Sequence, residues 1–353
     1  MISIGVDAHK SLHVAVAVNE AGQVLAQWRG ANDAGGWAEV QEWAQALGAE
    51  RQWGIEGAWN YGRGLAQQLV AAGEVVYEVN ARWTARGRSQ ALKRGKTDER
   101  DAQAIALVVR REDVRLPRVA PEDAAAVLEV LTTQRDAALA EATRLRNQAH
   151  QLLLQCDPQY RQHLPALTTE AGVAALVAYT APRADAVSTA RAATLQMLGQ
   201  RLQLAVQQAA TLEEQIVTRA RAGFSPLIRL KGINALTAGA LAGLLGPGQR
   251  FRNDGDVAAY AGVAPLEASS AGRVRHRLNR GGNRRLNALI HRIAVTQMRC
   301  WPPAQQYVAR RLSEGKTKRE AIRALKRYIA RAIWQLWREC ERLEQRPLDA
   351  RAA

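Results

Sequence analysis

The sequence is poor in cysteine, and its three cysteines, Cys156, Cys300 and Cys340, lie far apart. They form none of the close pairs typical of zinc sites, and scattered cysteines of odd number give no disulfide framework. We therefore expect three structural thiols in a reducing compartment, which predicts a cytoplasmic protein.

Long apolar runs are absent as well. No stretch approaches the ~18 consecutive apolar residues that a membrane helix needs. The first ten residues, MISIGVDAHK, lack a basic region followed by an apolar stretch, so no secretory signal is expected. With 47% hydrophobic and 23% charged residues, the 353-residue chain is expected to fold into two or three globular domains, which excludes a disordered or collagen-like protein.

Acidic residues are scarce in the last third of the chain. Residues 1–225 carry 24 basic and 24 acidic side chains, whereas residues 226–353 carry 25 and 9, so the whole net charge of +16 arises there. Within residues 273–331 the ratio is 17 to 2. A block this one-sided favours a polyanion, here nucleic acid, over ordinary solvated charge. An anionic membrane surface is a weaker alternative, because no long helix with a continuous apolar face accompanies the block.

The first 118 residues predict a mixed α/β domain. The expected elements are strands 2–8, 12–18 and 23–29, helix 33–47, strand 52–56, helix 61–72, strand 74–79 and helix 98–111. Three antiparallel strands followed by alternating helices and strands are typical of a ribonuclease-H-like fold, the fold of RuvC-type nucleases. Residues 80–97 predict a basic loop, and Thr97 is expected to cap the helix after it.

The remaining residues predict helices. Residues 119–225 should contain two long helices, 122–155 and 186–221, that form either a coiled-coil arm or a pair packed on its own domain. Residues 226–353 should form a basic, mostly helical domain. Within it, residues 227–246 resemble a helix-hairpin-helix unit, which binds DNA phosphate through backbone N–H groups. The best candidates for nucleic-acid contacts follow in the basic loop and the helix after it: Arg273, Arg275, Arg277, Arg280, Arg284 and Arg285.

Four carboxylates are expected to converge in the first domain. Asp7 and Glu56 each lie at the end of a strand, and these two strands are neighbours in a ribonuclease-H topology. Asp98 and Asp101 are three residues apart on one helix and therefore share a face. Such a group suits Mg²⁺, which prefers oxygen ligands. Pairs of Mg²⁺ ions about 4 Å apart stabilise the charge that phosphodiester chemistry develops.

These residues and others resemble the DEDD insertion-sequence transposases. These transposases are relatives of the Piv-type invertases and are also called bridge-RNA-guided recombinases. The matching segments are GVDAHK (5–10), the strand-end Glu56, KTDERDA (96–102), RFRNDGDVAAYAGVAP (250–265), ASSAGR (268–273) and NRGGNRRLNALI (279–290). The resemblance covers both ends of the chain. It implies a RuvC-like domain over residues 1–118, a coiled-coil arm over 119–225 and a transposase domain over 226–353.

The resemblance also implies a reaction and its partners. A serine attacks the phosphodiester and forms a phosphoserine link to DNA, and the strands are then exchanged. Ser270 occupies the matching position, with Ser269 as the adjacent alternative. The family further implies a structured guide RNA, donor and target double-stranded DNA, and a homodimer or homotetramer.

Two other functions fit part of the sequence. A RuvC-like endonuclease that cleaves branched DNA with water would use the same carboxylates, but it would leave the C-terminal match unexplained. A non-catalytic nucleic-acid-binding protein would not need all four carboxylates. His9, two residues after Asp7, is either a structural histidine or a residue that faces the metal or the nucleic acid. Trp59, Asn60 and Tyr61 form either core or a base-stacking surface.

Overall fold

The computed structural model describes residues 1–80, 97–112, 116–246, 250–267, 276–277 and 282–352. Their contacts divide the chain into two compact units. The first comprises Met1–Asp123, Leu230–Gly232 and Leu245–Ala353, and the second comprises Ala124–Arg229 and Ile233–Leu244. No helix in the described ranges is both long and apolar enough to cross a membrane.

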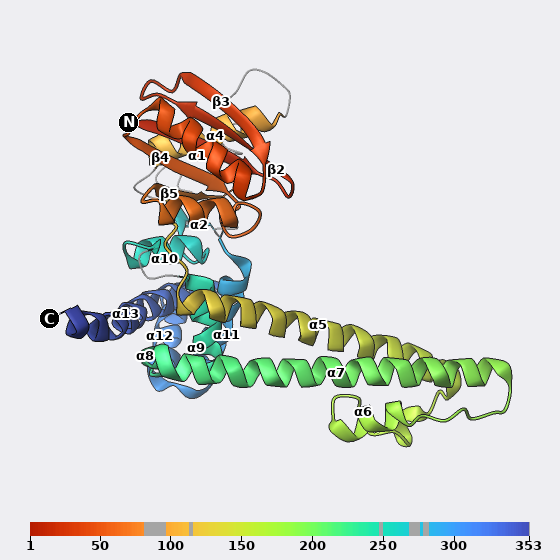
Figure 1. Cartoon of the computed structure of the whole chain (residues 1–353). Helices are drawn as coiled ribbons and strands as arrows, with labels where there is room; N and C mark the ends of the chain where they lie inside the picture. The colour runs from red at the N-terminus through yellow and green to blue at the C-terminus, as the bar shows by residue number, and fades with distance from the viewer. Residues whose placement is uncertain (81–96, 113–115, 247–249, 268–275, 278–281, 353) are drawn as a thin grey trace. The chain divides into compact units, whose positions relative to one another are not determined.

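A five-stranded mixed sheet forms the N-terminal part of the first unit (Figure 1). Its strands are β1 (Ile2–Ala8), β2 (Leu12–Val18), β3 (Val24–Ala31), β4 (Arg51–Glu56) and β5 (Val75–Val79). They lie in the order β3-β2-β1-β4-β5, with β1 antiparallel to β2 and parallel to β4. The sequence predicted the antiparallel leading strands and the pairing of β1 with β4, and the observed order is compatible with a ribonuclease-H-like domain.

Helices cover both faces of this sheet. Alternate residues of β2 face opposite sides, so Ala15 and Ala17 belong to the core under α1 (Ala34–Leu47) and α2 (Arg63–Ala71). On the other face Val14, Val16 and Val18 pack against Ala102 and Ala106 of α4 (Asp98–Glu112). The period-two alternation of the strand sequence therefore decides which residues meet which helix.

Two glycines bring α4 close to the centre of the sheet. A Cβ on Gly5 of β1 would lie 2.1 Å from the carbonyl oxygen of Ala102, and one on Gly54 of β4 would lie 2.1 Å from the Val109 side chain. Side chains at these positions would push α4 away. The absence of Cβ atoms at positions 5 and 54 thus sets the height of α4, and of its acidic first turn, above β1 and β4.

His13 is a buried histidine within β2. Its side chain is 0% exposed, and desolvation lowers the pKa of the ring. Between this lowered pKa and the unfolded value of about 6.5, the unfolded chain binds more protons than the folded one. The free energy of unfolding should therefore fall as the pH drops below about 6.5, and His13→Gln should remove that part of the pH dependence. Urea midpoints at pH 5 to 8 test this, with His163→Gln at an exposed position as the control.

The second unit is built on two long helices, α5 (Ala124–Cys156) and α7 (Ala186–Gly223), which lie side by side (Figure 1). Arg135 pairs with Glu213 at 2.8 Å, and Arg201 pairs with Glu141 at 3.2 Å, so the helices run antiparallel. Their contact contains alanine and leucine, including Ala142, Leu145 and Leu202. In the sequence, η2 (Tyr160–Gln162) and α6 (Glu170–Val177) connect α5 to α7. After α7 the chain continues into α8 (Ser225–Ile228) and α9 (Ala235–Leu245).

The expected helix pair over residues 227–246 is only partly right. α8 is a single turn, and the longer helix α9 begins after Gly232, whose φ of 91° allows the chain to turn. Asn234 then caps α9, because its side chain accepts a hydrogen bond from Thr237 N at 2.8 Å.

The rest of the first unit is largely helical. Its elements are α10 (Asp254–Tyr260), the two-residue strands β6 (Leu266–Glu267) and β7 (His276–Arg277), α11 (Arg284–Cys300), α12 (Pro302–Ser313) and α13 (Lys318–Ala352). Trp337 of α13 is 1% exposed and belongs to the buried core.

Candidate active site

Asp7 and Glu56 are direct neighbours at one edge of the sheet. β1 and β4 run parallel, and their register pairs Asp7 with Glu56 at the last step of the ladder. Strands this apolar are buried on both faces, so polar side chains are confined to their ends. The two carboxylates therefore arise from adjacent strand ends, as the topology predicted.

The acidic first turn of α4 supplies two more carboxylates. The Thr97 side chain accepts a hydrogen bond from Arg100 N at 3.3 Å, which starts the helix where the sequence predicted. Asp98 is partly exposed, whereas Asp101 is only 5% exposed. Acidic residues also suit this end of a helix, because its backbone N–H groups carry partial positive charge.

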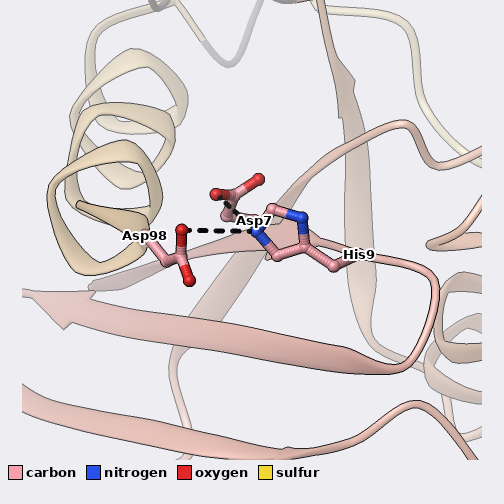
Figure 2. Close-up of side chains that lie close together, drawn as sticks. All are labelled: Asp7, His9 and Asp98. Carbon is pink, nitrogen blue, oxygen red and sulfur yellow. Dashed lines mark ion pairs between the residues drawn. The ribbon is translucent and has the colours of Figure 1, made fainter. Parts of the chain in front are cut away.

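Among the described residues, one group has the geometry of a metal site: Asp7, His9 and Asp98, whose ligand atoms lie within 4.8 Å of one another. His9 Nε2 is 3.2 Å from Asp7 Oδ2 and 3.5 Å from Asp98 Oδ1 (Figure 2). The ring thus lies between a carboxylate from the sheet and one from α4. Two carboxylate oxygens and an imidazole nitrogen converge here, which is a donor set able to hold a divalent cation.

The structure thus brings together Asp7 and Asp98 of the four expected carboxylates. Glu56 is beside Asp7 by strand register, and Asp101 is one helical turn beyond Asp98, but neither belongs to the group within 4.8 Å. The added member is His9. Its only sequence signal is its place just after the end of β1, and this did not decide between a structural and a metal-facing role.

Asn32 joins three loops beside this group. Its side-chain amide donates to the carbonyl oxygens of His9 at 3.1 Å, Lys10 at 3.3 Å and Tyr61 at 3.1 Å. Its Oδ1 accepts from Trp37 Nε1 at 2.9 Å, which fixes the amide orientation. The turn after β1 and the loop after β4 are therefore held together just beyond Asp7 and Glu56.

A buried arginine connects the loop after β4 to the C-terminal helices. Arg250 is 4% exposed, pairs with Glu78 of β5 and lies over the rings of Tyr260 (4.4 Å to the centroid) and Trp59 (5.1 Å). The same Glu78 carboxylate accepts from Trp59 Nε1 at 3.1 Å. Burial alone would lower the Arg250 pKa, but the Glu78 carboxylate, together with Tyr260, more than offsets this, and the pKa is raised.

Most of the predicted nucleic-acid and serine residues lie outside the described residues: Ser269, Ser270, Arg273, Arg275 and Arg280. Arg277 lies in β7, where only the backbone is described. Arg284 and Arg285 are exposed in the first turn of α11, and Asn283 caps that helix through its side chain. Tyr260 accepts a hydrogen bond from Asn283 N at 2.6 Å and so links this cap to Arg250.

Comparisons with known proteins agree with these features. A family model of the DEDD type, described as "Transposase", matches residues 4–158, and one described as "Transposase IS116/IS110/IS902 family" matches residues 225–309. The chain is 25% identical to the insertion element IS116 uncharacterized 44.8 kDa protein of Streptomyces clavuligerus, over 96% of this chain and 95% of that protein. It is 27% identical to the insertion element IS900 uncharacterized 42 kDa protein of Mycobacterium paratuberculosis, over 95% of each.

The two family models together cover more than half of the chain, and they include the strand end with Asp7, the acidic turn of α4 and the start of α11. Membership of such a family makes the protein an enzyme that acts on DNA in transposition. The chain belongs to the DEDD transposases of the IS110/IS116/IS902 family.

Proposed function

We propose that this transposase recombines DNA through a serine nucleophile assisted by divalent metal, and that Ser270 is that nucleophile. The observation that carries the proposal is the convergence of Asp7, His9 and Asp98 beside Glu56 at one sheet edge. Carboxylates this close repel one another, and a bound cation would relieve that repulsion further than the Arg29 guanidinium, which lies 3.8 Å from Asp98 Oδ2.

The side chains fit a bound metal. His9 Nε2 is buried and, within the described residues, has no hydrogen-bond partner, although two carboxylates lie within 3.5 Å. Asp7, Glu56, Asp98 and Asp101 would hold Mg²⁺ at this edge. When bound, the ion supplies positive charge against the phosphate oxygens that become negative during the reaction.

The serine step is a transesterification. The Ser270 Oγ forms a bond to phosphorus, the bond from phosphorus to the leaving deoxyribose oxygen breaks, and that oxygen takes up a proton. Strand exchange then reverses the step with a different deoxyribose oxygen, so no bond energy is lost. A serine hydroxyl is a weak nucleophile until a base or metal activates it. Metal held by the carboxylates at the sheet edge would supply that activation.

Each of the three parts of the chain would then have a separate role. Residues 1–118 hold the metal, residues 119–225 space or join protomers in a dimer or tetramer, and residues 226–353 bind donor and target DNA and carry the serine. A structured guide RNA would select the DNA sites. Family resemblance supports the RNA, and the basic charge of the last third supports a polyanion in general.

An SDS-stable adduct assay tests the proposed function. The protein is expressed with its native flanking DNA, supplied with Mg²⁺ and denatured, and protein-linked DNA is then sought. We expect an adduct in wild type and in Ser269→Ala, and none in Ser270→Ala. Loss in Ser269→Ala alone would move the nucleophile by one residue. Cleaved ends without any adduct would instead favour a nuclease that uses water.

DNA affinity should depend steeply on salt, because the basic residues displace counterions from phosphate. Arg284→Ala with Arg285→Ala should weaken binding and reduce the slope of log K against log salt by about 2. The matched control is Arg144→Ala with Arg201→Ala, two exposed arginines that share Glu141. An unchanged slope in the first pair would contradict contact through the start of α11. Filter binding between 50 and 300 mM salt measures the slope of log K against log salt for each variant.

A further inference from the structure

The imidazole of His9 occupies the position of a metal ligand. Its Nε2 is 3.2 Å from Asp7 Oδ2 and 3.5 Å from Asp98 Oδ1, yet it forms no hydrogen bond with either, so the nitrogen points between the two oxygens (Figure 2). A charged pair alone would gain from turning the N–H onto one carboxylate. Instead, the ligand atoms of Asp7, His9 and Asp98 lie within 4.8 Å of one another, which is the grouping of a three-ligand metal site.

The distances agree with this interpretation. Nitrogen and oxygen ligands lie about 2.0–2.2 Å from a transition-metal ion. Two neighbouring ligands at such lengths are then separated by roughly 3.0–3.5 Å, the range of both His9 distances. The backbone supports the position, because His9 N donates to Leu12 O at 3.0 Å and its carbonyl accepts from Asn32.

We propose that His9 Nε2 is a metal ligand alongside Asp7 and Asp98, and that this nitrogen makes the site select Mn²⁺ over Mg²⁺. The inference rests on the proposed metal centre and goes beyond its carboxylates. Mg²⁺ takes oxygen ligands and keeps several waters, so an imidazole adds little to its affinity. Mn²⁺ accepts the same carboxylates, and as a first-row transition ion it is a softer acceptor than Mg²⁺, so an added imidazole nitrogen raises its affinity more than that of Mg²⁺.

Pulsed EPR of the full-length protein loaded with MnCl₂ tests the ligand directly. Wild type grown with ¹⁴N-histidine should show electron-spin-echo modulation from a directly bound nitrogen, and ¹⁵N-histidine should change the pattern to that of ¹⁵N. His9→Ala should lose this coupling. Its Kd for Mn²⁺ should rise at least about tenfold, and its Kd for Mg²⁺, from competition with Mn²⁺, should change less than about threefold.

Two further variants sharpen the test. His163→Ala removes an exposed histidine of the second unit and should leave the nitrogen coupling intact. His9→Asp replaces the nitrogen with oxygen and should lower the Mn²⁺-to-Mg²⁺ preference while metal is still bound. Its binding also shows that a change at position 9 preserves the fold.

The outcomes separate this inference from the proposed function. If Mn²⁺ binds wild type without nitrogen coupling, or if the coupling survives in His9→Ala, His9 is not a ligand and the inference is wrong, while the carboxylate centre stands. If Mn²⁺ does not bind wild type at all, the metal centre of the proposed function itself fails.

Discussion

Asp7→Asn is expected to lower DNA strand cleavage by at least about 10³-fold, with DNA binding unchanged within about threefold. The carboxylate is the link between the sheet edge and the group of Asp7, His9 and Asp98. Loss of one anionic ligand removes several kcal/mol of charge stabilisation, and each 1.4 kcal/mol corresponds to about a factor of ten in rate. Binding persists because the basic block of residues 273–331 is separate in sequence. Asp101→Asn should have a similar effect.

The control for this prediction lies on the same helix turn. Glu99 follows Asp98, is 40% exposed, pairs with Arg29 at 3.6 Å and does not belong to the metal-type group. Glu99→Gln removes the same charge from α4 and should retain cleavage within about threefold, because exposed ion pairs contribute little. Cleavage assays in Mg²⁺ and in Mn²⁺, with gel-shift binding in parallel, measure both effects. Normal cleavage by Asp7→Asn in both metals would refute a catalytic role for the acidic edge.

The sheet and the strand-end carboxylates could be predicted because they follow from local patterns. The apolar strand 2–8 and the turn residues after it define β1, and the chain order of strands and helices then makes β1 and β4 neighbours. Because the carboxyl ends of neighbouring parallel strands lie at the same edge of the sheet, Asp7 and Glu56 were expected close together, and the observed register pairs them directly. The start of α4 could also be predicted from local sequence, because Thr97 is a capping residue before an acidic turn.

The role of His9 could not be predicted in the same way. It lies beyond the end of β1, so alternation along the strand no longer fixes its direction. Its position depends on Asn32, which is 23 residues away and holds the His9 carbonyl. The hydrophobic pattern carries no signal for a hydrogen bond between such distant residues.

The burial of Arg250 could not be predicted from local sequence patterns either. The sequence placed it at the start of a family motif within a basic domain, where an arginine is expected to face solvent or DNA. In the structure it is buried, because Glu78, 172 residues earlier in the chain, supplies the opposite charge. Pairing of this kind depends on tertiary structure, so charge counting misassigns such a residue.

Arg250→Ala is expected to lower the opening free energy of the first unit by about 3–5 kcal/mol, because it leaves the Glu78 carboxylate without its buried partner. The guanidinium also contacts the rings of Trp59 and Tyr260, so its removal leaves a gap. Hydrogen exchange of the β5 amides measures the loss, since these amides lie in the strand that carries Glu78.

A double-variant cycle separates the charge from the packing. Arg250→Met fills much of the volume without charge, and Glu78→Gln keeps an oxygen that can accept from Trp59 Nε1. Each single variant leaves one buried group unmatched and should cost several kcal/mol, whereas the pair should recover most of that loss, since neutral replacement of both partners is often tolerated. Additive losses in the double variant would mean that Arg250 acts through packing alone.

The same cycle bears on activity. Trp59 lies three residues after Glu56, and its indole is held by Glu78 and stacked under Arg250. Tyr260 joins Arg250 to Asn283, the cap of α11. If this chain of contacts orders both the loop after Glu56 and the start of α11, the double variant should fold stably and still cleave DNA more slowly than wild type. Full cleavage activity in a stable double variant would limit Arg250 to a role in stability.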